Sequence, residues 1–386
     1  MKKLIAFILS TIMLFALSAC GQGGTSDTQD ADTYTVTDMI GREVALDSIG
    51  KYSRVVCIGA GALRMYSYVG EMSLVCGVED IDNLSLDNRP KMFDEVARPY
   101  ILAYGDGLSA LPSCGVGGPS AQTAEAEKIL SCDPDIVISL YEDVEKADAL
   151  QEQLGVPVIT LRSGVNGVFD EVFRQSLTLL GSIFGREARA VELISFIDAQ
   201  TADISSRTKN IPDGEKPSVY ICGLGNWGTA NHLMTSQNYV PFNAANVRNA
   251  VTDLGKNGVQ TIEEEKFVAL GDAMDVMIID AAAVKNIAPL YAEDSTMFDT
   301  CKAWRSGEVY LQMAYNAYYT NYEITLMNAW FIAKTVYPEQ FADVDIAAKT
   351  NEITKAFLGQ ELADEIFACP SSFGGYQRID TGTFFG

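Results

Sequence analysis

A glycine-rich segment at residues 220–237, YICGLGNWGTANHLMTSQ, has the composition of a phosphate-binding loop. Its glycines at positions 223, 225 and 228 follow an apolar run and fit G-x-G-x-x-G, the fingerprint of a dinucleotide-binding turn. That fingerprint also requires a helix that opens at the third glycine and an acidic residue about 20 positions beyond it. Here Asn231, His232 and Asn238 make a poor helix interior. The candidate acidic residue, Asp253, comes 25 residues after Gly228, with Pro241 between them. The pattern is therefore weak evidence for a dinucleotide, and we expect the loop to serve another ligand.

Known catalytic motifs are missing from the sequence. His232 is the only histidine and there is no G-x-S-x-G segment, so a Ser-His-Asp hydrolase has no support. There is no Walker loop, no H-E-x-x-H, no C-x-x-C pair and no Cys/His cluster suited to zinc. The acidic run IEEEK at residues 262–266 is typical of a solvated helix face rather than of catalytic carboxylates. We therefore expect a protein that is not an enzyme and has no resident cofactor or metal.

The first twenty residues, MKKLIAFILSTIMLFALSAC, predict the compartment. Two lysines precede an uncharged stretch that is short for a membrane span, which needs about 20 residues, but suits a signal peptide. The ending LSAC resembles the lipobox of bacterial lipoproteins, so Cys20 is the expected lipidation site, with an ordinary signal peptide as the alternative. Residues 21–33 are rich in Gly, Ser and Asp and predict a flexible tether. Two acyl chains would hold the domain outside the cytoplasmic membrane.

Length and charge narrow the class of protein further. The chain has 386 residues, and after removal of a signal it still exceeds the size at which single cores divide, so two lobes are expected. A hydrophobic content of 48% is ample for packed cores. The net charge of −23 argues against binding of nucleic acid or of an anionic bilayer through the body of the protein.

Short apolar runs alternate with helical patterns along the chain, which predicts βα units and an α/β fold. The runs are continuous rather than alternating, which is typical of parallel strands covered on both faces. The predicted strands are residues 54–59, 74–78, 135–140, 157–161, 218–223, 276–280 and 309–313. Helical patterns lie between them, for example at residues 121–130 and 142–154.

The middle of the chain predicts one long helix. Residues 185–208 contain no proline and many helix formers, and they would span roughly 35 Å as a helix. The spacing of apolar residues approximates one face, formed by Ala190, Ile194, Ile197, Ala202 and Ile204. We therefore expect an N-terminal lobe at residues 34–165, a helical segment at 166–210 and a C-terminal lobe at 211–386. Both lobes begin with a strand that runs into a glycine-rich loop, at residues 54–64 and 218–228, and these loops would face each other across a cleft.

Several segments resemble one family of proteins. YTVTDMIGREVAL followed by KYSRVVCIGAGALRMYSYVGEMSLVCGVED is similar to the start of extracytoplasmic substrate-binding proteins of ABC importers, in the branch that takes up iron chelates, heme and vitamin B12. ILSCDPDIVISL, LGVPVITL and YYTNYEITLMNAWFIAKTVYPEQF resemble later segments of the same family. The resemblance runs from Tyr34 to about Asp380. It implies two Rossmann-like α/β lobes with parallel sheets, joined by one long helix, with the ligand in the cleft between the lobes.

The resemblance also implies which residues contact the ligand. Trp227 and Tyr239 would offer flat apolar surface in the cleft loop of the second lobe, and Tyr318 and Tyr319 would stack against a chelate or macrocycle. Because heme-binding members of the family use His, Met or Tyr as axial ligands, His232 is a candidate ligand, with Met65 or Tyr66 opposite. A solvated or locally hydrogen-bonded imidazole remains the alternative. In the first lobe, Ser120 is a candidate helix N-cap whose neighbouring amides meet an anionic ligand.

One residue departs from the family pattern. Members present a glutamate in the first helix of each lobe, which docks onto arginines of the permease, but here the first position aligns with Arg64. Either docking uses other residues, or Arg64 points into the cleft toward an anionic chelate.

Together these features predict a monomeric, lipid-anchored receptor that delivers a metal chelate, foremost a ferric siderophore, to an ABC permease and its ATPase. A receptor for heme or cobalamin, a receptor for an oxyanion, and an extracytoplasmic lipoprotein enzyme are the alternatives.

Overall fold

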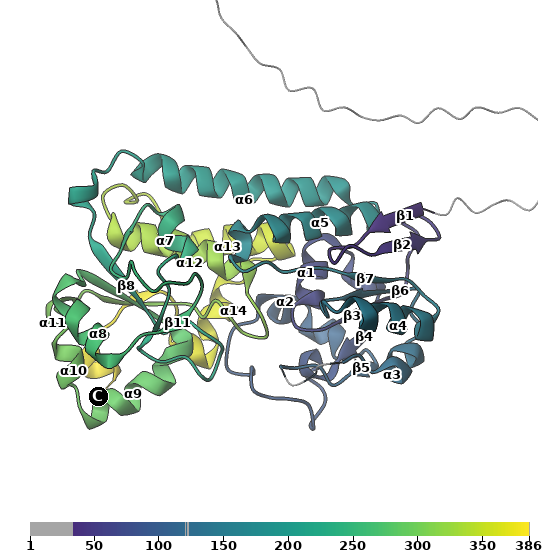
Figure 1. Cartoon of the computed structure of the whole chain (residues 1–386), viewed down its shortest axis with the longest axis horizontal. Coiled ribbons are helices and arrows are strands. Elements are labelled where there is room, and N and C mark those ends of the chain that lie inside the picture. Colours follow the sequence, from purple (N-terminus) through teal and green to yellow (C-terminus); the bar gives the residue numbers. More distant parts are fainter. Residues whose placement is uncertain (1–33, 120, 122, 386) are drawn as a thin grey trace, which may run out of the picture.

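The computed structural model describes residues 34–385 except residues 120 and 122, and it consists of two α/β lobes (Figure 1). The N-terminal lobe contains a five-stranded sheet of order β5-β4-β3-β6-β7, in which every pair of neighbours is parallel. Its strands are β3 (Val55–Ile58), β4 (Val75–Glu79), β5 (Ser113–Gly115), β6 (Ile136–Ser139) and β7 (Val158–Thr160). Every residue of β3, β6 and β7 is buried, as expected of parallel strands covered on both faces.

Helices and one hairpin complete this lobe. The helices are α1 (Ala62–Val69), α2 (Pro99–Leu108), α3 (Ala126–Ser131), α4 (Val144–Leu154) and α5 (Glu171–Phe184). The antiparallel hairpin of β1 (Tyr34–Thr37) and β2 (Glu43–Leu46) packs at the outer edge, where the buried Arg42 donates to Asp148 and to the carbonyl of Val158.

The C-terminal lobe contains a second sheet of order β10-β8-β12-β13-β14. Its strands are β8 (Ser218–Cys222), β10 (Arg248–Asn249), β12 (Val276–Asp280), β13 (Val309–Gln312) and β14 (Gln377–Arg378). The edge strand β14 is antiparallel to β13, which departs from the purely parallel sheet that was expected. A separate antiparallel ribbon pairs β9 (Met234–Thr235) with β11 (Gln260–Thr261).

The helices of this lobe are mostly short. They are α7 (Val240–Ala244), α8 (Glu264–Leu270), α9 (Val284–Glu293), α10 (Thr296–Asp299), α11 (Lys302–Ser306), α12 (Tyr322–Val336), α13 (Ile346–Leu358), α14 (Ala363–Ala368) and α15 (Thr381–Phe384). No helix in the described part of the chain combines the length and the apolar character that a membrane span requires.

The long helix α6 (Glu187–Thr208) runs along one side of both lobes, at the top of Figure 1. Glu187 in its first turn and Arg207 in its last both match the helix dipole. Its buried face is formed by Ala190, Leu193, Ile197, Gln200, Ile204 and Thr208. This corrects the expected face, because Ala202 is exposed and Ile194 is only partly buried.

Each sheet reverses its strand order at one point. From β3 the chain builds β4 and β5 on one side and then β6 and β7 on the other, while β10 and β12 flank β8 in the same way. Open α/β sheets bind ligands outside the carboxyl ends of strands at such reversals. The loops after β3 and β6, and after β8 and β12, are therefore where a ligand site is expected.

The two lobes share one hydrophobic core. A single cluster of buried side chains contains Val55 from β3, Ile221 from β8 and Tyr322 from α12. The C-terminal helices also return to the first lobe, where the hydroxyl of Tyr104 in α2 donates to the carbonyl of Leu358 in α13 at 2.6 Å. Relative motion of the lobes is consequently restrained by packing as well as by α6.

Candidate functional site

The segment of residues 313–321, between β13 and α12, lies between the two lobes. Tyr318 and Tyr319 both have left-handed backbone angles, with φ of 49° and 70°, a conformation that is costly without glycine and must be held by surrounding contacts. A Cβ atom at Gly61, in the first glycine loop, would lie 3.5 Å from Cβ of Tyr319. Asn316 donates to Asn226, in the second glycine loop, at 3.0 Å. The tyrosine-rich segment therefore lies between the two glycine loops.

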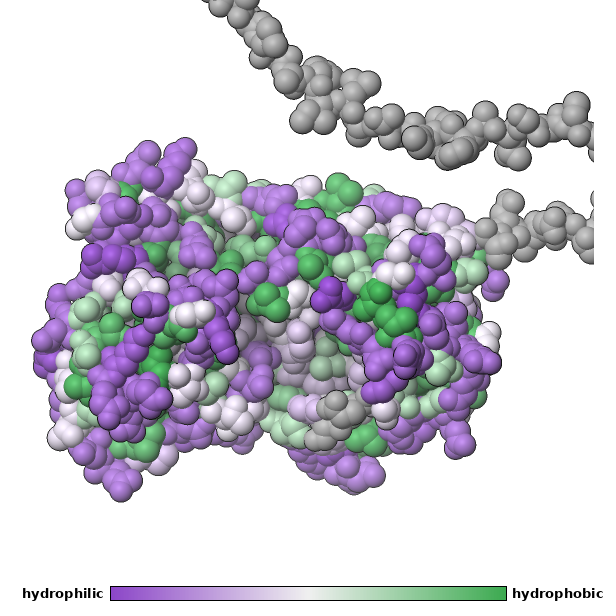
Figure 2. All heavy atoms as spheres, in the orientation of Figure 1, coloured by the Kyte–Doolittle hydropathy of each residue, from purple (hydrophilic) through white to green (hydrophobic). Residues whose placement is uncertain are grey.

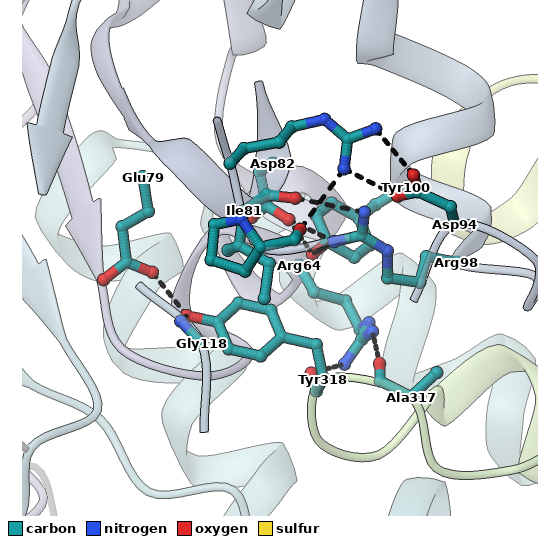
Figure 3. Close-up of polar contacts among 12 residues, drawn as sticks. Arg64, Glu79, Ile81, Asp82, Asp94, Arg98, Tyr100, Gly118, Ala317 and Tyr318 are labelled. Atoms are coloured by element: carbon teal, nitrogen blue, oxygen red, sulfur yellow. Dashed lines mark hydrogen bonds and ion pairs between the residues drawn. The ribbon is translucent and has the colours of Figure 1, made fainter. Parts of the chain in front are cut away.

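Tyr318 is inserted into the N-terminal lobe. Its hydroxyl donates to Oε2 of Glu79, the last residue of β4, at 2.6 Å, and accepts from the amide of Gly118 at 3.1 Å (Figure 3). Its ring centroid lies 5.8 Å from that of Phe93, and the residue is 3% exposed. This corrects the expected position of Tyr318 in the cleft, because its hydrogen bonds join the two lobes instead.

Arg64 holds the same segment from the other side. Its Nη1 donates to the carbonyls of Tyr318 and Thr320, both at 2.9 Å, and its Nη2 donates to the carbonyl of Ala317 at 2.7 Å (Figure 3). The side chain is fully buried, and its guanidinium carbon lies 4.8 Å from the ring centroid of Tyr100. This corrects the expectation that Arg64 points into the cleft toward an anionic chelate, because its guanidinium is buried against backbone carbonyls of residues 317–320.

A second buried arginine supports this arrangement within the N-terminal lobe. Arg98 forms an ion pair with Asp82 and donates to the carbonyl of Ile81 at 3.2 Å. The hydroxyl of Tyr100, whose ring stacks against Arg64, donates to the same Asp82 carboxylate at 2.8 Å. Buried charges of this kind are tolerated only when paired and hydrogen-bonded, and Figure 3 shows both arginines in contact with acceptors.

Two buried carboxyl groups lie behind the tyrosine-rich segment, one in each lobe. Burial raises the pKa of Glu79 to about 7, although hydrogen bonds from Tyr318 and Gly59 oppose the shift. Burial likewise raises the pKa of Asp280, at the end of β12, to about 7, against hydrogen bonds that include one from Gln312 at 3.0 Å. Both groups therefore change protonation near neutral pH.

The first recess lies at the carboxyl ends of β3 and β6. It has a volume of about 330 Å³ and is lined by residues that include Ala60, Leu140 and Tyr141 from the N-terminal lobe and Tyr319 from the other lobe. Tyr319 is 41% exposed. This places Tyr319 at the strand-order reversal of the first sheet, where a bound molecule can stack on its ring.

The second recess lies between residues 165–167, after β7, and the C-terminal lobe. It has a volume of about 290 Å³, and its lining includes Leu224, after β8, together with Tyr239 and Tyr315. Ser163 lines the first recess and Val165 the second, so the two are neighbours. On the face shown in Figure 2 the surface is hollowed between the lobes. Tyr239 reaches this recess although it is only 6% exposed and exchanges hydrogen bonds with Gln312.

Trp227 lines a third recess, of about 400 Å³, whose other lining residues include Lys285 of the second lobe and Lys91, Met92, Asp94 and Glu95 of the first. Lys285 forms an ion pair with Glu95 across the interface. Trp227 is half-buried, so it is accessible at the interface between the lobes. The other residues that line this third recess do not line the first or the second.

His232 lies in the core of the C-terminal lobe. Its ring is 5.4 Å from the rings of both Phe267 and Phe298, and it is 4% exposed. Burial lowers its pKa, and neither ring nitrogen has a hydrogen-bond partner. This corrects the expected position of His232 in the cleft, because aromatic side chains enclose it. Met65 and Tyr66, its proposed counterparts, are fully buried as well.

The glycine motif of residues 223–228 serves close packing of the backbone. A Cβ atom at Gly223 would lie 2.1 Å from Cβ of Ala283, and one at Gly225 would lie 2.6 Å from Cε of Met234. Turns follow Gly228, and the next regular element is the strand β9, so no helix opens at the third glycine. Ser120 and Cys20 lie outside the described residues.

Sequence reasoning missed Glu79 and Asp280. Glu79 follows the predicted strand 74–78, and Asp280 ends the predicted strand 276–280. A carboxylate at the carboxyl end of a parallel strand is a signal for a site, because ligands bind outside that edge of the sheet. Tyr141 and the asparagines of the second recess were missed too, because loop residues carry no periodic pattern.

The sequence matches a family model described as periplasmic binding protein over residues 100–311, more than half of the chain. The chain belongs to the periplasmic binding protein family, whose members are transport components rather than enzymes. It is 30% identical over 98 residues to the uncharacterized ABC transporter substrate-binding lipoprotein YvrC of Bacillus subtilis (strain 168). That match covers 25% of this chain and 30% of the relative.

Solved structures share the fold at low identity. The molybdate periplasmic binding protein MolA of Haemophilus influenzae, solved with molybdate bound, superposes with a TM-score of 0.63 at 16% identity, over 85% of this chain and 98% of that chain. A periplasmic solute binding protein from Veillonella parvula gives a TM-score of 0.64 at 18% identity, over 88% and 96%. These likenesses establish the two-lobed fold.

Proposed function

We propose that this protein is the substrate receptor of an ABC importer, that it is anchored outside the cytoplasmic membrane through Cys20, and that it captures a metal-chelate nutrient of the ferric siderophore type. It would deliver this cargo to a membrane permease and its ATPase. The family membership and the lipoprotein relative support the transport role and the location.

The observation that carries the proposal is the exposed ring of Tyr319 at the strand-order reversal of the first sheet. Tyr315 and Tyr239 extend the aromatic surface into the neighbouring second recess. Ligand sites commonly measure about 300–1,000 Å³ and combine aromatic walls with a few polar groups, which these recesses do. The shared core of the lobes favours a largely preformed site with modest hinge motion.

Heme and cobalamin remain alternative cargoes of the same site. The enclosure of His232, Met65 and Tyr66 weakens axial ligation of heme by these residues, because a core would have to open first. Stacking of a macrocycle on Tyr319 would not require such opening.

The test is calorimetric titration of the purified protein with a ferric trihydroxamate, a ferric tricatecholate, heme, cobalamin and molybdate. We expect saturable binding of a ferric chelate, weakened at least about fivefold by Tyr319→Ala, since an aromatic contact contributes about 1 kcal/mol beyond its buried area. The matched control is Tyr34→Ala in β1, because Tyr34 is 38% exposed and lies far from the cleft loops in the first hairpin. Exclusive binding of another panel member would replace the proposed cargo, and no binding by the folded protein would refute the uptake role for these cargoes.

A further inference from the structure

We propose that the cargo is an uncharged chelate, in which the organic ligand cancels the charge of the metal, rather than an anionic one. This inference rests on the proposed function and deepens it by naming the charge class of the substrate. The argument comes from the side chains that line the first and second recesses.

The second recess has no charged side chain among its described lining residues. Its polar groups are neutral and include the side chains of Asn166, Asn238 and Asn257. Lys256 adjoins Asn257 in the sequence, but it does not line the recess. A ligand seated there would meet amide donors and acceptors and apolar surface, without a formal charge.

The first recess contains one charged side chain among its described lining residues, that of Glu142. Arg162 neutralises it, because Nε of Arg162 lies 2.8 Å from the Glu142 carboxylate and both side chains are half-exposed. The recess therefore offers no unpaired cation in its described part.

The two buried arginines behind the tyrosine-rich segment are engaged elsewhere. Arg64 donates to three backbone carbonyls of the tyrosine-rich segment, and Arg98 is paired with Asp82. Both are buried, so neither can turn toward a ligand without breaking these contacts. The third recess, beside Trp227, carries two lysines and two carboxylates and is balanced as well.

The surroundings add negative rather than positive potential. The whole chain carries a net charge of −23. Behind the tyrosine-rich segment, burial raises the pKa of both Glu79 and Asp280 to about 7, so these carboxyl groups add negative charge only above that pH. An anionic chelate would approach against this field and would then lose water without gaining a counter-charge. A neutral chelate has neither cost.

The apolar side chains at the entrance of the second recess also suit a neutral ligand. Val165 of the first lobe and Val259 of the second are 90% and 36% exposed, and both line the second recess. Apolar side chains exposed at a rim are typical of a surface that is covered in the bound state. A ferric trihydroxamate has this character, with an apolar exterior and with carbonyl oxygens that asparagine amides can meet.

The test compares two ferric complexes by calorimetry with the full-length protein: a neutral trihydroxamate and a strongly anionic tricatecholate. We expect the neutral complex to bind at least about tenfold more tightly, because the anionic one is desolvated without a partner. The exposed position of Val165 permits a reciprocal variant that does not disturb the core, Val165→Arg, with Val165→Gln as the matched neutral control.

Val165→Arg is expected to strengthen binding of the anionic complex about fivefold at low salt, and the gain should disappear at high salt. Val165→Gln should leave the preference unchanged. Equal or tighter binding of the anionic complex by the unmodified protein would overturn the charge inference while leaving the receptor function intact. Failure of every chelate in the panel to bind the folded protein would instead overturn the proposed function, and this inference with it.

Discussion

Replacement of Arg64 by methionine tests whether this arginine, in α1 of the N-terminal lobe, holds the tyrosine-rich segment of the C-terminal lobe in place. Methionine keeps an unbranched side chain of similar length but removes the guanidinium. The carbonyls of Ala317, Tyr318 and Thr320 then lose donors that now lie at 2.7 to 2.9 Å, and they are left in a buried interface.

The size of the effect follows from these contacts. Hydrogen bonds from a charged group contribute about 1.5–3 kcal/mol each, so three of them set an upper range for the loss. Removing the buried cation offsets part of it, because Nε of Arg64 has no acceptor and burial of the charge is itself unfavourable. We expect the free energy of unfolding to fall by about 3–5 kcal/mol, because three buried carbonyls are left without donors at about 1–3 kcal/mol each.

Urea unfolding measures the free energy, and hydrogen exchange of the amides in residues 313–321 locates the effect. The matched control is Arg98→Met, which removes an equally buried arginine whose partners all lie in the N-terminal lobe. Arg98→Met should destabilise the protein but leave exchange in residues 313–321 near its original rate, whereas Arg64→Met should accelerate it. Two results together would refute the role of Arg64 in holding the segment. They are a fall in the free energy of unfolding of less than about 1 kcal/mol for Arg64→Met and an unchanged rate of hydrogen exchange in residues 313–321.

Two further predictions concern buried titratable groups. Burial raises the pKa of Glu79 from 4.5 to about 7 in the folded protein. Between these two pH values the folded state keeps the Glu79 proton, whereas the unfolded state has released it. The free energy of unfolding therefore falls as the pH rises through that window. Glu79→Gln should remove this part of the pH dependence, which is at most roughly 3 kcal/mol between those limits. The measurement is the urea midpoint as a function of pH. If the variant keeps the original pH slope, Glu79 is not the group responsible. His232→Leu should leave the melting temperature unchanged or higher, since it removes two ring nitrogens without hydrogen-bond partners from an aromatic core. Heme binding that disappears in His232→Leu while the fold persists would instead restore the axial-ligand role.

Much of the fold was predictable because its signals are local. The seven strands predicted from continuous apolar runs are all present within one residue of the expected bounds, as comparison of residues 135–140 with Ile136–Ser139 illustrates. The exceptions have local causes as well. The strands that were not predicted are short and lack the continuous apolar run used for prediction; they are β1, β2, β5, β9, β10, β11 and β14. The helix α3 begins at Ala126 rather than at residue 121.

The site was less predictable, because burial is decided by partners distant in the sequence. Tyr318 and Tyr319 are neighbours of identical type, yet one is 3% exposed and the other 41%. The difference depends on Glu79 and Gly118, which supply hydrogen bonds to Tyr318 from the other lobe. No pattern within residues 313–321 could distinguish the two tyrosines.

The sequence alone therefore determined the two-lobed α/β class, the order of its strands along the chain and the long α6, because hydrophobic periodicity and glycine placement act over a few residues. It also determined the acidic character of the chain and the resemblance to its family. Only the tertiary structure decided that Arg64 clamps the lobes, that His232 is enclosed and that Tyr319 faces a recess. The clamp by Arg64 depends on residues 253 positions apart in the chain, Arg64 and Ala317, whose contact exists only once the two lobes have packed together. The enclosure of His232 depends on Phe267 and Phe298, which reach it only when the C-terminal lobe has folded.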